Sequence, residues 1–176
     1  MRHLVDRERL LHFMRELGRR SSAAARIYLT GGSSAVLLEW RASTIDVDLE
    51  IRPETDAILR LFPGLKEELQ INVELASPGH FIPELPGWEE RSRFILREGK
   101  IDFFHYDFCA QALSKLERSH TRDLADVRAM LDRNLIEPGP LLDLYTSIEP
   151  ELYRYPAVDP RNFRRAVERF LLSSAP

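Results

Sequence analysis

The chain contains a single cysteine, Cys109, among its 176 residues. One cysteine excludes a disulfide framework and a zinc site built from several cysteines. The five histidines have no His-x-x-x-His spacing, so they do not predict a zinc site either. Apolar runs such as residues 35–38 are short, whereas a bilayer span needs about 20 residues. The N-terminus is charged throughout, unlike a secretory signal. We therefore expect a cytoplasmic protein with no membrane association.

Lysine is also scarce, with three lysines against 22 arginines in a chain of net charge −3. Seven arginines lie within residues 1–26, and residues 161–169 are again rich in arginine. Positive ends of this kind could bind phosphates or a nucleic acid. For each end alone, the solvated face of an amphipathic helix is the simpler interpretation.

Hydrophobic periodicity predicts a mixed α/β first part, followed by an all-helical second part. The expected strands are 26–30, 44–51, 71–75, 94–97 and 100–104. The expected helices are 6–18, 35–40, 55–69, 107–119, 121–133, 141–149 and 160–172. We expect an α/β core over residues 1–106, and a helical segment over 107–176 that packs on it as one compact unit.

Several local expectations follow from the same patterns. Strict alternation in the second and third strands predicts that Ile45 and Leu75 face the core. Ser33 or Ser34 is expected to cap the helix that follows the glycine turn. Pro138 is expected to lie in a break between two helices.

The most informative segment joins a Gly31-Gly32-Ser33 turn to two acidic residues, Asp46 and Asp48. Glycines allow a ligand close to the backbone, and free N–H groups at a helix start favour phosphate. The two aspartates are two residues apart on a strand, so both project from one face, with Cα atoms roughly 6.5–7 Å apart. Such a pair beside a phosphate-binding turn can hold Mg²⁺. Taken singly, each feature also fits an ordinary loop or the wet face of a sheet.

The order Gly32-Ser33, helix, Asp46-Val-Asp48 resembles the signature of the nucleotidyltransferase superfamily of the DNA polymerase β type. The later residues 112–118 and 121–126 resemble the Lys-Leu…Arg-Asp-x-x-Asp-Leu block of AbiEii toxins and related bacterial nucleotidyltransferase-like families. The resemblance covers most of residues 26–133.

This resemblance implies a small mixed sheet flanked by helices, with a helical C-terminal segment that helps to hold the nucleotide. It also implies Mg²⁺-dependent transfer of an NMP group from an NTP, such as ATP, to a hydroxyl acceptor. The acceptor would be an RNA such as tRNA, or a protein, and a toxin would have an antitoxin partner. Carried over by position, the implied site residues are Gly31, Gly32 and Ser33 at the triphosphate, Asp46 and Asp48 at the metal, Lys115 near the phosphates, and Asp123 in support.

A third carboxylate is needed to complete the pattern, and the family usually has an aspartate there. The third strand instead offers Asn72 and Glu74 on one face, and Asp102 on a later strand is the competitor. We favour Glu74, because it can bind a second metal and accept a proton, whereas an amide cannot. A solvated strand residue is the other interpretation of Glu74.

Three functions remain open at this point. The first is a nucleotidyltransferase, and the second is a catalytically weak nucleotide-binding or partner-binding protein on the same fold. The third is a phosphohydrolase, which is least favoured because no nucleophile or histidine acid lies near the aspartate pair. Lys115 is equally well explained as a partner of Glu117 or as a surface charge.

Overall fold

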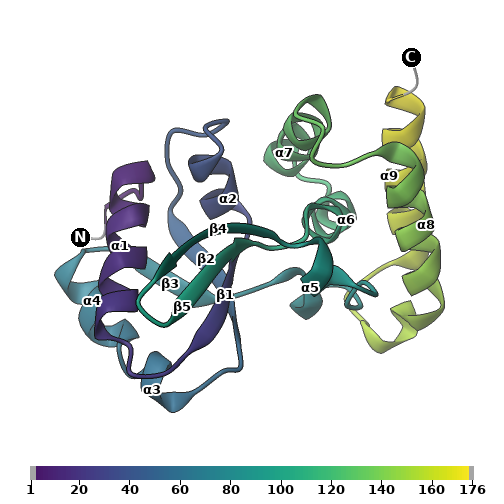
Figure 1. Ribbon diagram of the computed structural model, residues 1–176. Coiled ribbons are helices and arrows are strands. Elements are labelled where there is room, and N and C mark those ends of the chain that lie inside the picture. The colour runs from purple at the N-terminus through teal and green to yellow at the C-terminus, as the bar shows by residue number, and fades with distance from the viewer. Residues whose placement is uncertain (1–2, 175–176) are drawn as a thin grey trace. The chain divides into compact units, whose positions relative to one another are not determined.

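The first part of the chain folds around a five-stranded mixed sheet (Figure 1). In order across the sheet, its strands are β3 (Asn72–Leu75), β2 (Asp46–Arg52), β1 (Ala25–Leu29), β5 (Ile101–His105) and β4 (Arg93–Glu98). Strand β1 is antiparallel to β2 and parallel to β5, while β3 is parallel to β2 and β4 is antiparallel to β5. The expected α/β fold class, with a mixed sheet flanked by helices, is confirmed.

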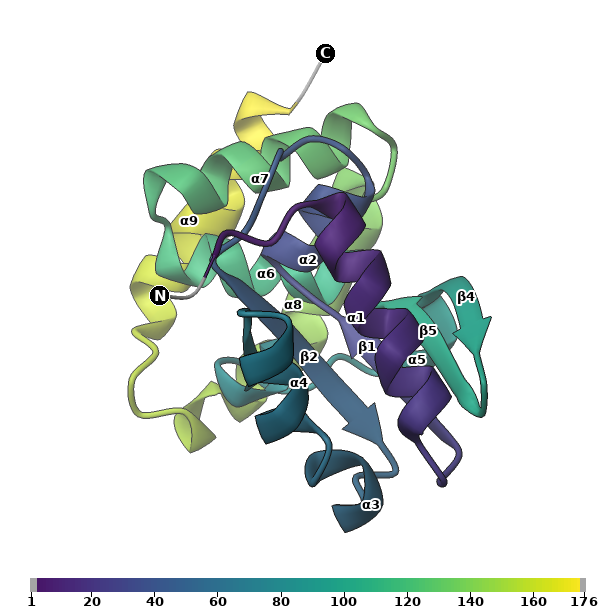
Figure 2. The ribbon, with the colours of Figure 1, turned by 90° about the vertical axis from the view of Figure 1, so that its left-hand side faces the viewer.

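Helices cover one face of this sheet, as Figure 2 shows for α1 and α4. They are α1 (Arg7–Arg20), α2 (Gly32–Leu37), α3 (Asp56–Leu59) and α4 (Phe62–Glu68). Alternate strand residues, including Ile27, Leu49 and Val73, meet apolar side chains of α1 such as Phe13 in one buried core. Because a strand turns successive side chains to opposite faces, the residues between them face away from this core. Asp46 and Asp48 are two of these.

The second part is helical, as expected. Its elements are η1 (Pro78–His80), α5 (Trp88–Arg91), α6 (Phe108–Arg118), α7 (Thr121–Asp132), α8 (Pro138–Ile148), η2 (Glu149–Arg154) and α9 (Pro160–Ser173). Helix α6 contacts α7, α8, α9 and η1, and residues 108–116 are all buried. Asp107 caps α6 by accepting a hydrogen bond from the Cys109 N–H.

The structure describes residues 3–174, and its contacts divide the chain into two compact units. The sheet unit comprises the chain up to residue 77 together with 92–106, and the helical unit comprises 78–91 together with the chain from residue 107. The loop 78–91 therefore groups with the helices, although it precedes the boundary drawn at residue 106. The packing of the two parts into one unit stays a prediction.

Four local expectations are wrong. Ile45 is 62% exposed, because it lies before β2 and outside the strand ladder, and Leu75 is 41% exposed at the end of the edge strand β3. Ser33 and Ser34 lie inside α2, whose N-cap is Gly31, so neither serine is the cap. Pro138 begins α8 instead of breaking the chain, because the first turn of a helix needs no proline N–H.

Candidate functional site

The glycine turn lies directly beside the second aspartate of β2. Gly31 has a φ of 57°, a left-handed conformation that favours glycine. A Cβ atom added to Gly31 would lie 3.4 Å from Oδ2 of Asp48, and the Thr30 N–H donates to the Asp48 carbonyl at 3.0 Å. The turn and the carboxylate therefore form one local site, in the arrangement expected from their order in the sequence.

Gly32 is required for a different reason. A Cβ atom there would lie 2.1 Å from Oγ1 of Thr44, a distance that no real contact allows. The Thr44 hydroxyl also donates to the backbone carbonyl of Asp46 at 3.1 Å. Gly32 thus allows the start of α2 to pack against the residues that lead into β2. The sequence pattern had suggested only the close approach of a ligand as the reason for this glycine.

Ser33 follows in α2 and is completely buried. Its Oγ atom has no hydrogen-bond partner in the described part of the chain. A buried hydroxyl without a partner is costly, so such groups call for an explanation such as a ligand or water. The predicted role of Ser33 at a triphosphate stays a prediction, and this hydroxyl is the atom that would serve it.

Asp46 and Asp48 are aligned with two polar residues of the neighbouring strand. In the parallel pairing of β2 with β3, Asp46 is opposite Asn72 and Asp48 is opposite Glu74. Paired residues of adjacent strands share a face, so all four side chains project from the same side of the sheet. The Asn72 amide donates to Oδ1 of Asp46 at 2.8 Å and to Oε1 of Glu74 at 2.7 Å. The structure thus brings Glu74 next to the aspartate pair.

Asp102 shares this face but lies elsewhere on it. It pairs with Arg26 of β1, which in turn pairs with Arg52 at the far end of β2. Arg52 is four residues beyond Asp48, which is roughly 13 Å along a strand. Asp102 is also held by Arg97, with N–O distances of 2.6 and 2.7 Å, and this hydrogen-bonded guanidinium lowers the pKa of the carboxyl. The structure does not bring Asp102 to the pair.

The donor set fits Mg²⁺ by its chemistry. Asp46 and Asp48 offer hard carboxylate oxygens and are both partly exposed. Within residues 3–174, no three or more His, Cys, Asp and Glu side chains are grouped so that they could hold a metal ion. Mg²⁺ does not require such a group, because it commonly combines one or two carboxylates with water and substrate phosphates. The metal roles of Asp46 and Asp48 stay predictions.

Lys115 and Asp123, both predicted site residues, meet each other in the helical unit. The Lys115 side chain is buried, with Nζ 2.7 Å from Oδ2 of Asp126 and 3.5 Å from Oδ1 of Asp123. Asp123 also accepts from Arg118 at 2.8 Å. Two cations of α6 and two anions of α7 therefore neutralise one another. This buried cluster is neither the surface charge nor the Glu117 pair that the sequence offered as alternatives.

His105 was not singled out from the sequence, because an isolated histidine has no spacing signal. It ends β5 and is buried, with Nδ1 3.0 Å from Oγ of Ser34, which lies in α2. Burial lowers the pKa of His105 to about 4, with a smaller contribution from the charge of Arg93. A neutral imidazole therefore supports the helix that follows the glycine turn.

This combination of a mixed sheet, a Gly-Gly-Ser turn and an Asp-x-Asp strand defines a nucleotidyltransferase-type domain. The chain belongs to a protein family described as "Nucleotidyltransferase of unknown function (DUF6036)", whose model matches residues 8–168. No curated protein and no solved structure matches the chain. The resemblance to the nucleotidyltransferase superfamily is thus supported, and the AbiEii-type resemblance is not confirmed. Across residues 3–174, the helices are too short or too polar to cross a membrane.

Proposed function

We propose that the protein transfers an NMP group from an NTP to a hydroxyl acceptor, with Mg²⁺ held by Asp46 and Asp48. The observation that carries this proposal is the alignment of Asp48 with Glu74 beside the Gly31 turn, in a chain of a nucleotidyltransferase family. When bound, Mg²⁺ would neutralise the charge that develops on the phosphate oxygens during an in-line displacement.

The proposed reaction assigns a separate task to each group of residues. The acceptor oxygen attacks the α-phosphorus, the bond to the pyrophosphate oxygen breaks, and the hydroxyl proton passes to Glu74. Glu74 suits this task because it is exposed and lies opposite Asp48. The buried Ser33 hydroxyl would donate a hydrogen bond to the triphosphate. Gly31, which has no side chain, would let the triphosphate approach Asp48. Lys115 and Asp123 are proposed to contribute to nucleotide binding.

The acceptor is proposed to be an RNA, such as tRNA, or a protein. A toxin role, with an antitoxin as partner, is supported by the resemblance of residues 112–126 to the block found in AbiEii toxins. Expression of the wild type should then arrest growth, whereas Asp48→Asn should not. Equal growth with both proteins would contradict the toxin role while leaving the transfer reaction untouched.

The direct test is incubation with each α-labelled NTP and total tRNA or cell protein, with Mg²⁺ or with a chelator. We expect label in the acceptor and release of pyrophosphate only with Mg²⁺. Binding of NTP without turnover on any acceptor would instead support the alternative of a catalytically weak nucleotide-binding protein. That alternative is favoured by the bridging amide of Asn72, which occupies one oxygen each of Asp46 and Glu74.

A further inference from the structure

The side chain of Asn72 joins two carboxylates of the candidate site. Its Nδ2 atom donates to Oδ1 of Asp46 at 2.8 Å and to Oε1 of Glu74 at 2.7 Å. An amide nitrogen carries two hydrogens, so each carboxylate receives one of them. Asp46 lies opposite Asn72 in the pairing of β2 with β3, and Glu74 follows on the same face of β3. One neutral side chain therefore fixes the separation of the two acids.

Another acid on this face of the sheet is held differently. Glu50, farther along β2, accepts a hydrogen bond from the Arg52 guanidinium. A guanidinium neutralises the carboxylate that it binds, whereas an amide donates hydrogen bonds without adding charge. In the described part of the chain, neither Asp46 nor Glu74 forms an ion pair. This end of the face thus keeps two negative charges that a cation could neutralise.

The same amide limits how well these acids can hold a cation by themselves. Each hydrogen bond occupies one carboxylate oxygen, and Asn72 contributes no negative charge of its own. Over the residues that the structure describes, no three His, Cys, Asp or Glu side chains are grouped so that they could hold a metal ion. Mg²⁺ commonly completes its coordination with water and substrate phosphates. The phosphates of a nucleotide would therefore supply the negative charge that Asn72 does not.

We infer that Asn72 is a positioning residue that makes binding of the divalent cation depend on the nucleotide. It holds Asp46 and Glu74 together, but it withholds the further negative charge that would bind a cation without nucleotide. The inference deepens the proposed function and rests on it, because it concerns the same cation and the same face of the sheet. Aspartate has nearly the shape of asparagine, so N72D isolates the effect of this one charge.

The test consists of two calorimetric titrations of the full chain, without an acceptor and at constant ionic strength. In the first, Mg²⁺ alone is added to the protein, and in the second each NTP is added with Mg²⁺ or with a chelator. The wild type should bind Mg²⁺ alone only weakly, and should bind its NTP more tightly with Mg²⁺ than with the chelator. N72D should bind Mg²⁺ alone about tenfold more tightly than the wild type, because cation affinity rises with the number of charged ligands.

N72A removes the two hydrogen-bond donors without adding a charge. Mg²⁺ alone should bind this variant no more tightly than it binds the wild type, because no ligand has been gained. The Mg²⁺-dependent affinity for NTP should fall by about tenfold or more, the usual effect of losing a residue that orients a metal ligand. The two variants at this position are therefore expected to differ in opposite directions from the wild type.

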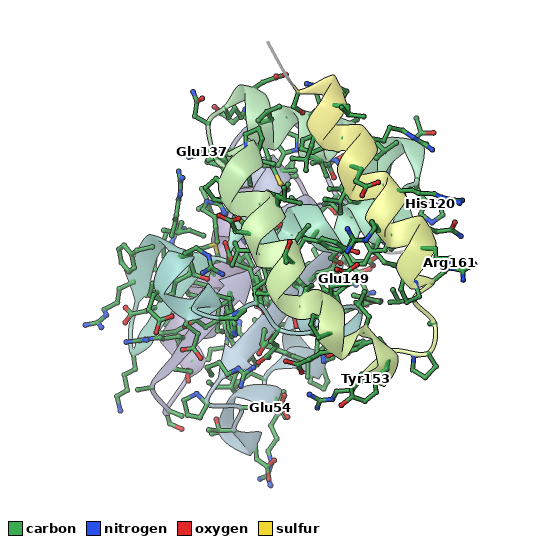
Figure 3. All side chains as sticks on the ribbon, turned by 90° about the vertical axis from the view of Figure 1, so that its right-hand side faces the viewer. Glu54, His120, Glu137, Glu149, Tyr153 and Arg161 are labelled. Atoms are coloured by element: carbon green, nitrogen blue, oxygen red, sulfur yellow. The ribbon has the colours of Figure 1, made fainter. Side chains whose placement is uncertain are left out.

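N162D is the matched control for the added charge. Asn162 follows Arg161, which Figure 3 labels at the start of α9, and its amide donates to Oδ2 of Asp159 at 3.0 Å. N162D therefore also replaces an amide beside a carboxylate with a second carboxylate, but in the helical unit. It should bind Mg²⁺ as weakly as the wild type does. An equal gain in N162D and N72D would assign the effect to net charge and overturn the role of Asn72.

The stability of N72D gives a second readout. In this variant three carboxylates meet where an amide had joined two, so their repulsion should lower the midpoint of urea denaturation in a chelator. Mg²⁺ should restore the midpoint, because a ligand that binds only the folded state stabilises it, and KCl of equal ionic strength should restore it less. A merely structural role of Asn72 would lower the midpoints of N72D and N72A alike, with no specific response to Mg²⁺.

The inference and the proposed function can fail separately. Unchanged affinity of N72D for Mg²⁺ alone, or equally tight binding of Mg²⁺ alone by the wild type, would overturn the inference even if the wild type transfers NMP. Mg²⁺-dependent NTP binding without transfer to any acceptor would contradict the proposed function. The gain in N72D and the loss in N72A would then still support the role of Asn72. Equal NTP binding by the wild type with Mg²⁺ and with the chelator would contradict both.

Discussion

Nζ of Lys115 lies 2.7 Å from Oδ2 of Asp126, and both side chains are almost completely buried. Asp123 and Arg118 complete the cluster, which joins α6 to α7. Lys115, Asp123 and Asp126 are removed from water, which can be tolerated because each has a partner of opposite charge, whereas the Arg118 side chain is partly exposed. Lys115 was predicted to lie near the phosphates of a nucleotide. In the structure it joins α6 to α7.

Lys115→Ala should therefore destabilise the fold. Removal of one partner leaves Asp126 charged, buried and without its main partner, which typically costs about 3–5 kcal/mol. Urea denaturation should show a lower midpoint, and Lys115→Ala/Asp126→Ala should recover part of the loss. An unchanged midpoint in the single variant would contradict the structural role of Lys115. Nucleotide affinity, measured where both proteins are folded, separately tests the predicted role at the phosphates.

Asp46→Asn and Asp48→Asn should each weaken Mg²⁺-dependent nucleotide binding while leaving the fold intact. Each substitution removes a negative charge from a partly exposed side chain with little change of shape. Titration calorimetry with an NTP, with and without Mg²⁺, measures the effect. Glu50→Gln is the matched control, because Glu50 shares the strand and the face but pairs with Arg52. Wild-type affinity in both aspartate variants would remove the metal assignment.

Glu74→Gln should lower the transfer rate by about a hundredfold or more, the usual contribution of a positioned general base. Asp102→Asn should leave the rate within a factor of two or so, because Asp102 is held by Arg97 at the other end of the face. Pyrophosphate release under saturating NTP and acceptor gives both rates. The reverse ranking of the two variants would move the role to Asp102.

Gly32→Ala should destabilise the protein by about 1–3 kcal/mol, because the new methyl group overlaps the Thr44 side chain. Adding Thr44→Gly makes room for that methyl group, so the double variant should lose less stability than the sum of the single losses. The measurement is a double-mutant cycle, built from the free energies of unfolding of the wild type, the two single variants and the double variant. Strict additivity would show that Thr44 is not the residue that limits this site.

The buried histidine predicts a pH dependence of stability. His105 has a pKa of about 4 in the folded protein, lowered from 6.5 mainly by burial. The unfolded chain therefore binds the proton first as the pH falls from about 6.5 to 4. The free energy of unfolding should decrease over this window by about 3 kcal/mol, and the full contribution should be present above it. His105→Gln should flatten the curve of unfolding free energy against pH.

Much of the local structure was predictable from the sequence. Alternation in β2 and the Glu98-Gly99 turn between β4 and β5 are patterns that one segment carries by itself. The cap of α6 by Asp107 is equally local. The prediction that Ser33 or Ser34 caps α2 was wrong. Gly31 adopts a left-handed conformation and is itself the N-cap, so the helix already begins at Gly32. The predicted burial of Ile45 was wrong because alternation does not say where the strand ladder begins.

The amino-acid sequence by itself determined the fold class, the Gly-Gly-Ser turn and the shared face of Asp46 and Asp48, because a strand alternates its side chains with a period of two. Only the tertiary structure decided which strand lies beside β2. Glu74 and Asp102 have the same alternation in sequence, but the parallel pairing of β3 with β2 brings Glu74 opposite Asp48. The partners of Lys115 were decided in the same way, by the packing of α6 against α7. Contacts between separate segments depend on register and packing, which no single segment encodes.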